Sequence, residues 1–363
     1  MSKPNYCQLT EQHRRQAYQA VNDIVRIAIG HTQDEAALII YDTECPLAPL
    51  LAEAYQATLP QAQVIEISSV DNETVMAAFA AQAAGTLIVL IQSTHFRLDA
   101  YRLRVQLFAQ GLKVIEHVHL SRMINDEAPH YIASLAYDAD YYRGTGTALQ
   151  AKIAGAPDAK LISGRGDVLH YACPLEPAKL NVGDYRALKN IGGQFPIGEV
   201  FTEAVDLTAV HGRAQIYVFG DTTFHCNFPP EPITIVVDGG RITDVENSTP
   251  EFDAVLARIR EVEGEVWLRE LGLGLNRAFD RQRTVSDIGT YERLCGVHLS
   301  LGAKHGSYNK PQFKRKDTRF HIDVFIDVDG GVMLGTDNVY HAGRWQLAPC
   351  NAANSQLTTA AKL

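Results

Sequence analysis

The chain has 363 residues, enough for two domains of about 150 residues each. Its 46% hydrophobic and 21% charged residues are typical of a water-soluble globular protein with a large core. A net charge of −9 leaves no basic surface for phosphates, so we exclude nucleic acid as a partner. No apolar run approaches the roughly 18 residues of a membrane helix, so we expect no membrane association.

The cysteines and the N-terminus favour a cytoplasmic protein. Residues 1–10 lack the apolar stretch of a signal peptide. The six cysteines are scattered without a CxxC pair, which favours reduced thiols over disulfides or a cysteine zinc site.

Strands and helices alternate in the first half, which predicts an N-terminal doubly wound α/β domain over residues 1–158. The expected strands are Ala36–Tyr41, Gln63–Ile67, Thr86–Ile91 and Lys113–His117. The expected helices are Thr10–Ile29, Ala48–Thr58, Asn72–Ala83, Phe96–Gln110 and Tyr131–Ile153, the last broken near Gly144 and Gly146. No GxGxxG follows a strand, so no dinucleotide site is expected.

The second half, residues 159–363, is predicted to be a β-rich α+β domain. The expected strands are Lys160–Ser163, Val168–Cys173, Gln215–Phe219, Thr234–Val237, Arg241–Val245, Val266–Gly272, Val297–Leu301, His321–Asp327 and Val332–Leu334. A helix is expected over Thr249–Val262, and the small polar residues Asn351–Leu363 are expected to fray.

The strand around residue 322 carries the clearest sign of chemistry. His321 and Asp323 stand two apart and point to one face, because side chains alternate along a strand. Imidazole nitrogen and carboxylate oxygen both suit zinc, manganese and iron. The same pair also fits a hydrogen-bonded His–Asp pair on a half-exposed sheet.

Three further polar residues stand alone in apolar, glycine-flanked segments: Glu199, Glu270 and His298. A buried charge is costly unless it is paired or bound to a cation. Singly, each also fits an edge-strand carboxylate or a core histidine bonded to a carbonyl. Together with His321 and Asp323 they supply enough nitrogen and oxygen ligands for two divalent ions.

With these residues identified, the chain resembles the aminopeptidase T-like (leucyl aminopeptidase) family of dinuclear metallopeptidases. The matching blocks are Phe195–Thr202, Glu270–Asn276, Gly296–Gly302 and Phe320–Asp323. The resemblance implies that Glu199, Glu270, His298, His321 and Asp323 bind two divalent metal ions (zinc, cobalt or manganese). It also implies a homodimer that encloses the site and admits short peptides.

The resemblance implies a metallo-aminopeptidase, a hydrolase in which a metal-activated water attacks the first peptide bond and Glu199 or Glu270 carries the proton. The family has a tyrosine seven residues after the histidine of the third block, where this chain has His305, with Tyr308 nearby. Either could replace that tyrosine. His305 also fits an extra ligand, an acid/base or a loop histidine in water.

Two other functions fit the same residues. One is a ring-cleaving dioxygenase of the 2,5-dihydroxypyridine dioxygenase type, which holds a single non-haem iron by two histidines and one carboxylate. Those enzymes lack the first-block glutamate and have histidine at the second-block position, whereas this chain has Glu199 and Glu270. The other is a catalytically silent binding protein that keeps a structural metal.

Overall fold

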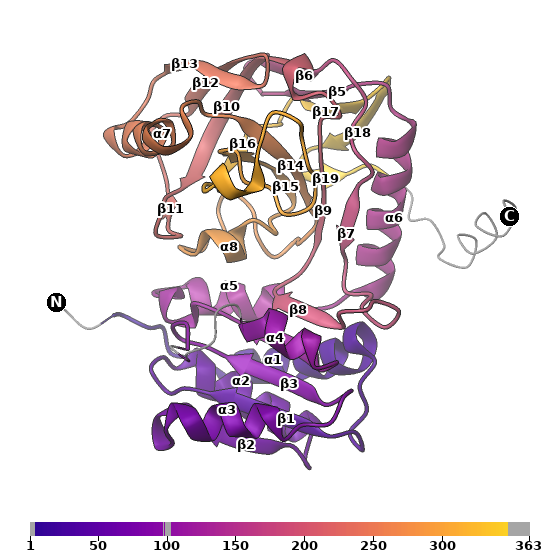
Figure 1. The fold of residues 1–363 in the computed structure, drawn as a ribbon, viewed down its shortest axis with the longest axis vertical. Coiled ribbons are helices and arrows are strands. Elements are labelled where there is room, and N and C mark those ends of the chain that lie inside the picture. The colour runs from indigo at the N-terminus through magenta and orange to yellow at the C-terminus, as the bar shows by residue number, and fades with distance from the viewer. Residues whose placement is uncertain (1–3, 97, 99–102, 348–363) are drawn as a thin grey trace, which may run out of the picture. The chain divides into compact units, whose positions relative to one another are not determined.

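The computed structural model describes residues 4–96, 98 and 103–347, and the segment Asn351–Leu363 lies outside them. The chain divides into two compact units, each assembled from several stretches (Figure 1). The first unit comprises Met1–Ala139, Gly183–Ile197 and Arg283–Thr290; the second comprises Asp140–Val182, Gly198–Gln282 and Tyr291–Leu363. The mixed α/β fold class is confirmed, whereas the simpler boundary near residue 158 stays a prediction.

The first unit is built on a parallel sheet of order β2-β1-β3-β4-β8. Its strands are β1 (Ala37–Tyr41), β2 (Gln63–Glu66), β3 (Leu87–Ile91), β4 (Lys113–His117) and β8 (Gly192–Phe195). Leu38, Ile88 and Val114 belong to an apolar core cluster on one face of the sheet. Ile39, Val89 and Ile115 on the other face are fully buried as well, as expected of a sheet covered on both sides.

Helices surround this sheet, and the first three lie near the positions that the periodicity predicts (Figure 1). They are α1 (Glu11–Asp23), continued by the π-helical turn η1 (Ile24–Ile29), α2 (Leu47–Thr58), α3 (Asn72–Ala80), α4 (Leu103–Ala109) and α5 (Glu127–Ser134). The first begins at Thr10, whose hydroxyl accepts a hydrogen bond from the backbone N–H of His13 at 3.3 Å.

Two helix boundaries were predicted wrongly. Phe96 is not helical, because its backbone N–H is held in a loop by the side-chain oxygen of Gln92 at 3.0 Å. The helical region 131–153 breaks at residues 135–138 and not at its glycines, which lie inside α6 (Ala139–Gly155). Gly146 is there for close packing: a Cβ atom on it would lie 2.6 Å from Cγ1 of Val182.

The second unit is a large antiparallel sheet of order β19-β18-β17-β5-β6-β10-β16-β15-β14-β9-β7, with β11, β12 and β13 attached through β10. Its strands are β5 (Ala159–Ile162), β6 (Val168–Tyr171), β7 (Lys179–Asn181), β9 (Glu199–Glu203), β10 (Val210–Gly220), β11 (Cys226–Asn227), β12 (Ile233–Asp238), β13 (Arg241–Glu246), β14 (Leu268–Gly274), β15 (Gly296–Leu301), β16 (Ile322–Ile326), β17 (Gly331–Leu334), β18 (Asp337–His341) and β19 (Arg344–Trp345). The helix α7 (Pro250–Glu263) has Thr249 as its N-cap, the residue at which the sequence predicted the helix to begin. The short α8 (Ile288–Tyr291) belongs to the first unit except for its last residue.

The expected strands are present, and the unexpected ones are short or polar. β8 was missed because Gly-Gly-Gln-Phe has neither an apolar run nor a clear alternation. Across the described residues, no helix combines the length and apolarity that crossing a bilayer needs.

A buried histidine anchors the first unit. Nε2 of His117 lies 2.8 Å from the Tyr55 hydroxyl, and Nδ1 lies 2.8 Å from the Tyr131 hydroxyl. The Tyr131 hydroxyl donates to the Phe195 carbonyl at 3.2 Å, so it accepts from Nδ1–H, and Tyr55 then donates to Nε2. Burial lowers the pKa of His117 to about 3, so the ring is neutral in the folded protein.

We expect this histidine to make stability fall with acid. Its pKa in the folded state is below the unfolded value near 6.5, so the unfolded chain binds the extra proton as pH falls. Between about pH 7.5 and about pH 5.5 this single group should remove about 1.4 kcal/mol of unfolding free energy.

The test is chemical denaturation of the natural chain and of His117→Gln at both pH values. Glutamine can donate to one tyrosine and accept from the other without titrating. The variant should therefore lose about 1.4 kcal/mol less than the natural chain over this interval. Equal losses in the two proteins would contradict the assignment of a neutral His117.

Candidate metal centre

Four adjacent strands of the second unit place carboxylates and an imidazole on one face of the sheet. In the antiparallel pairs, His298 stands opposite Gly272, Glu199 opposite Gly274, and Asp323 opposite Ser300. Residues directly opposite each other point to the same face, and so do residues two apart on one strand. Glu270 on β14 therefore shares its face with all three ligand-type side chains.

A glycine makes room for the central imidazole. A Cβ atom on Gly272 would lie 2.1 Å from both Cε1 and Nε2 of His298, so the ring crosses β14 where that strand has no side chain. It reaches between carboxylates of two strands, with Nε2 at 3.2 Å from Oε1 of Glu199 and 3.5 Å from Oε1 of Glu270. Glycine is therefore required at position 272, because any side chain there would occupy the space of the His298 ring.

The spacing of the polar atoms fits a bound cation better than direct hydrogen bonding. Nε2 of His321 lies 3.3 Å from Oδ1 of Asp323 and 4.0 Å from Oε1 of Glu270. Bonds of about 2.0–2.2 Å to nitrogen and oxygen place neighbouring ligands of one ion about 3.0–3.5 Å apart. Within the described residues, Nε2 of His298, Nε2 of His305 and Oδ1 of Asp323 are buried and make no hydrogen bond. A bound cation would satisfy such atoms.

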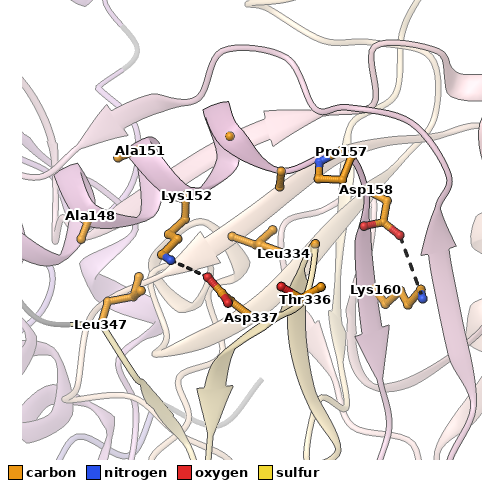
Figure 2. Close-up of a pocket in the computed structure, with 13 residues that line it drawn as sticks. Ala148, Ala151, Lys152, Pro157, Asp158, Lys160, Leu334, Thr336, Asp337 and Leu347 are labelled. Carbon is orange, nitrogen blue, oxygen red and sulfur yellow. Dashed lines mark hydrogen bonds and ion pairs between the residues drawn. The ribbon is translucent and has the colours of Figure 1, made fainter.

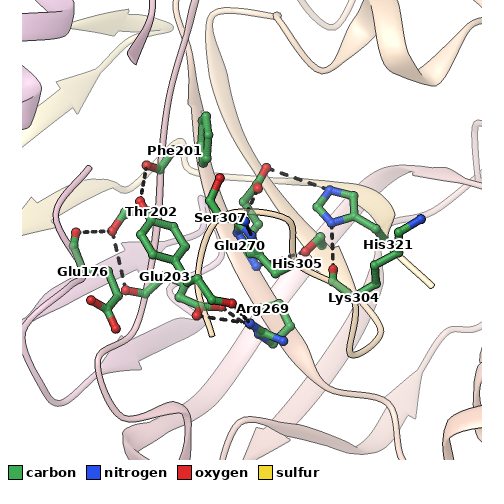
Figure 3. Close-up of polar contacts among 12 residues, drawn as sticks. Glu176, Phe201, Thr202, Glu203, Arg269, Glu270, Lys304, His305, Ser307 and His321 are labelled. Carbon is green, nitrogen blue, oxygen red and sulfur yellow. Dashed lines mark hydrogen bonds and ion pairs between the residues drawn. The ribbon is translucent and has the colours of Figure 1, made fainter. Parts of the chain in front are cut away.

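A backbone carbonyl orients His321. Its Nδ1 lies 3.2 Å from the carbonyl oxygen of Lys304, so Nδ1–H donates there (Figure 3). This leaves Nε2 facing Asp323 and Glu270. Metal-binding histidines commonly use their second nitrogen in this way.

His305 joins the cluster, and Tyr308 is turned to the backbone. The His305 side chain is 2% exposed, and its Nε2 lies 3.0 Å from Oε2 of Glu270 (Figure 3). The Tyr308 hydroxyl lies 2.8 Å from the Pro177 carbonyl and 3.3 Å from that of Phe201, and its ring packs against His305 with centroids 5.0 Å apart. The catalytic role of Tyr308 stays a prediction.

The loop that carries His305 is held by the residue beside Glu270. Arg269 is 2% exposed, and it donates to both ends of the loop, at the carbonyls of Ala303 and Tyr308. Its guanidinium also donates to both carboxylate oxygens of Glu203, at 2.7 and 3.2 Å (Figure 3). The ion pair with Glu203 anchors Arg269, and the two bonds to backbone carbonyls hold the loop without using any side chain of the ligand cluster.

The charges of the cluster shift its titration. Burial opposes ionisation of Glu270 and Asp323, but the facing histidines outweigh it and lower the pKa of both carboxyls. Burial likewise opposes protonation of His321 and His298. The carboxylates nevertheless raise the pKa of His321 to about 10 and that of His298 well above its usual value. The protons on His298 and His321 supply the positive charge that a metal ion would otherwise supply, so metal binding should release protons.

Two charged residues of the cluster, Glu292 and Arg293, were not identified from the sequence. One ligand atom from each of Glu292, His298 and Asp323 lies within 4.8 Å of the others, as do atoms of Glu199, Glu270 and His298. Burial raises the pKa of Glu292 to about 8, with Arg293 opposing the shift. Adjacent Glu and Arg residues usually mark a solvated loop, so neither residue type nor spacing could have pointed to them.

A separate pocket of about 850 Å³ lies between α6 and the turn after β17 (Figure 2). Its carboxylates already face cations: Lys152 pairs with Asp337, and Lys160 lies 4.0 Å from Asp158. No residue of the ligand cluster lines it, so it does not compete as the candidate metal site.

Two solved structures share this fold over nearly the whole chain. A 2,5-dihydroxypyridine dioxygenase from Pseudomonas putida is 16% identical, with a TM-score of 0.60, and the match covers 93% of this chain and 98% of that one. AmpT from Thermus thermophilus is 13% identical, with a TM-score of 0.55, and the match covers 92% and 100%. No family model and no curated protein matches the sequence. At these identities the comparisons establish the fold alone.

We expect Gly272→Ala to damage the site while the rest of the sheet stays folded. The new methyl group would displace the His298 ring. Metal affinity measured by titration calorimetry should fall at least roughly 10–100-fold, the range found when a ligand loses its support.

Gly155→Ala at the end of α6 is the matched control, because nothing lies within 4 Å of a Cβ atom there. It should leave affinity unchanged. Unchanged affinity in Gly272→Ala as well would refute the role assigned to His298.

Proposed function

We propose that this protein is a metal-dependent hydrolase of the aminopeptidase type that removes N-terminal residues from short peptides. The observation that supports it most is the convergence of Glu199, Glu270, His298, His321 and Asp323 on one buried face, with His305 beside them. A donor set of carboxylates and imidazoles without cysteine suits zinc, cobalt or manganese at a catalytic site. The fold shared with AmpT is consistent with this function.

A divalent ion held by these residues would lower the pKa of a bound water and polarise a peptide carbonyl. The protein would supply the proton transfers. Oε2 of Glu270 faces His305 at 3.0 Å, so this pair can accept a proton from water and return it to the leaving amine. Oε2 of Glu199 is bound by Arg293, so that oxygen is less available to a water molecule or a leaving amine.

The carboxylates can also serve a substrate with a free amine. Oxygen atoms of Glu199, Glu270 and Asp323 that a bound ion leaves free can accept hydrogen bonds from an N-terminal ammonium group. A homodimer that encloses the site remains part of this proposal.

A second candidate is a mononuclear iron dioxygenase. His298, His321 and Asp323 alone make a set of two histidines and one carboxylate, which suits oxygen chemistry at Fe(II). The fold shared with the dioxygenase structure is consistent with this candidate too. The extra carboxylates Glu199 and Glu270 favour hydrolysis.

The two candidates separate in one pair of assays. Aminoacyl chromogenic substrates with zinc, cobalt or manganese should release product, whereas ferrous iron in air with a dihydroxypyridine should consume no oxygen. Oxygen uptake without hydrolysis would reverse the assignment. Metal binding with neither reaction would indicate a catalytically silent binding protein.

We expect His321→Ala/Asp323→Ala to abolish metal binding and activity together. Hydrolysis should fall more than about 100-fold, because even residues that only support metal ligands are worth roughly 10–100-fold. Metal analysis of the purified variant should show only background metal.

The control pair is His211→Ala/Asp238→Ala, which removes an exposed His–Asp contact of 2.8 Å in the same unit. This variant should keep full metal content and activity. Stoichiometric metal in the His321/Asp323 variant would defeat the proposed function.

A further inference from the structure

Arg293 stands inside the candidate metal centre and contacts two of its carboxylates. Its Nη1 donates to Oε2 of Glu199, and its Nη2 lies 2.7 Å from Oε1 of Glu292. The Arg293 side chain is only 10% exposed. A guanidinium stays protonated at every relevant pH, so this positive charge is permanent.

The guanidinium occupies a coordination position. An ion bound to Oε2 of Glu199 would need the space next to that oxygen, where Nη1 already lies. The same holds for Oε1 of Glu292. A divalent ion placed beside Arg293 would also meet its charge at short range in a buried environment, where repulsion is strong.

The donor atoms that remain fit a single ion. Five donor atoms that Arg293 does not contact follow one another at distances of 3.2–4.0 Å: Oε1 of Glu199, Nε2 of His298, Oε1 of Glu270, Nε2 of His321 and Oδ1 of Asp323. A catalytic ion takes about three protein ligands, so this group satisfies one ion fully. Two ions would need about six protein ligands. Of the oxygens beside this group, Oε2 of Glu270 faces His305 at 3.0 Å, and Arg293 contacts Oε2 of Glu199 and Oε1 of Glu292.

We infer that Arg293 takes the place of a second metal ion, so that each chain binds one divalent cation instead of the two predicted from the sequence. Arg293 is then a positioning residue: it neutralises Glu199 and holds Glu199 and Glu292 in place on one side of His298. The inference rests on the proposed function for the identity of the ligands.

Metal stoichiometry tests this directly. Protein purified without metal is loaded with excess Mn²⁺, desalted and analysed for manganese per chain. The natural chain should hold one ion. Arg293→Met, which keeps an unbranched stem and removes the guanidinium and its charge, should hold two. Arg293→Lys keeps the charge and should stay at one.

The matched control is Arg213→Met. Arg213 also bridges two carboxylates of the second unit, Asp167 at 2.9 Å and Glu246 at 2.9 Å, and neither carboxylate belongs to the ligand cluster. It should hold one ion, like the natural chain. Electron paramagnetic resonance supplies a readout independent of activity: isolated Mn²⁺ in the natural chain and a spin-coupled pair in Arg293→Met.

The outcomes separate the inference from the proposed function. Two ions in the natural chain overturn the inference and leave the hydrolase proposal standing, and this result needs no variant to fold. One ion in a folded Arg293→Met also overturns it. Absence of any stoichiometric metal in the natural chain overturns both.

Discussion

The fold of the second unit buries several carboxylates of like charge close together on one face of its sheet. Glu199, Glu270 and Asp323 come from three strands and are all buried, which would be unfavourable if they remained alone. The strand register leaves them no other direction to point, because a shift of one residue would turn the apolar residues outward. The sheet can form only because counter-charges come with it: the imidazoles of His298 and His321 and the guanidinium of Arg293.

Support for the cluster comes from groups outside the set of ligand side chains. The Lys304 carbonyl orients His321, the missing side chain of Gly272 admits His298, and Arg269 secures the loop of His305. None of the three would be recognised as functional by residue type. Yet each fixes one imidazole, and fixed ligands bind without the entropy cost of ordering them.

Much of this arrangement could be predicted from the sequence, because the relevant patterns are local. Apolar runs predicted β1 and β3, and isolated acids and histidines in apolar segments indicated Glu199, Glu270 and His298. What could not be predicted depends on distant contacts. Glu292 and Arg293 look like a solvated charged pair, the glycines of α6 look like a break, and β8 has no strand pattern until it pairs with β4.

The chain returns to the sheet of the first unit at β8, and this limits how the protein can be divided into fragments. β8 pairs with β4 from Val114↔Gly192 to His117↔Phe195, and β9, with Glu199 as its first residue, follows after a three-residue connection. A fragment that stopped at residue 158 would expose the whole edge of β4 and invite aggregation. One that started there would contain a polar strand with no partner. Proteolytic fragments should therefore be sought by nicking surface loops and keeping both pieces together, instead of by expressing either half alone.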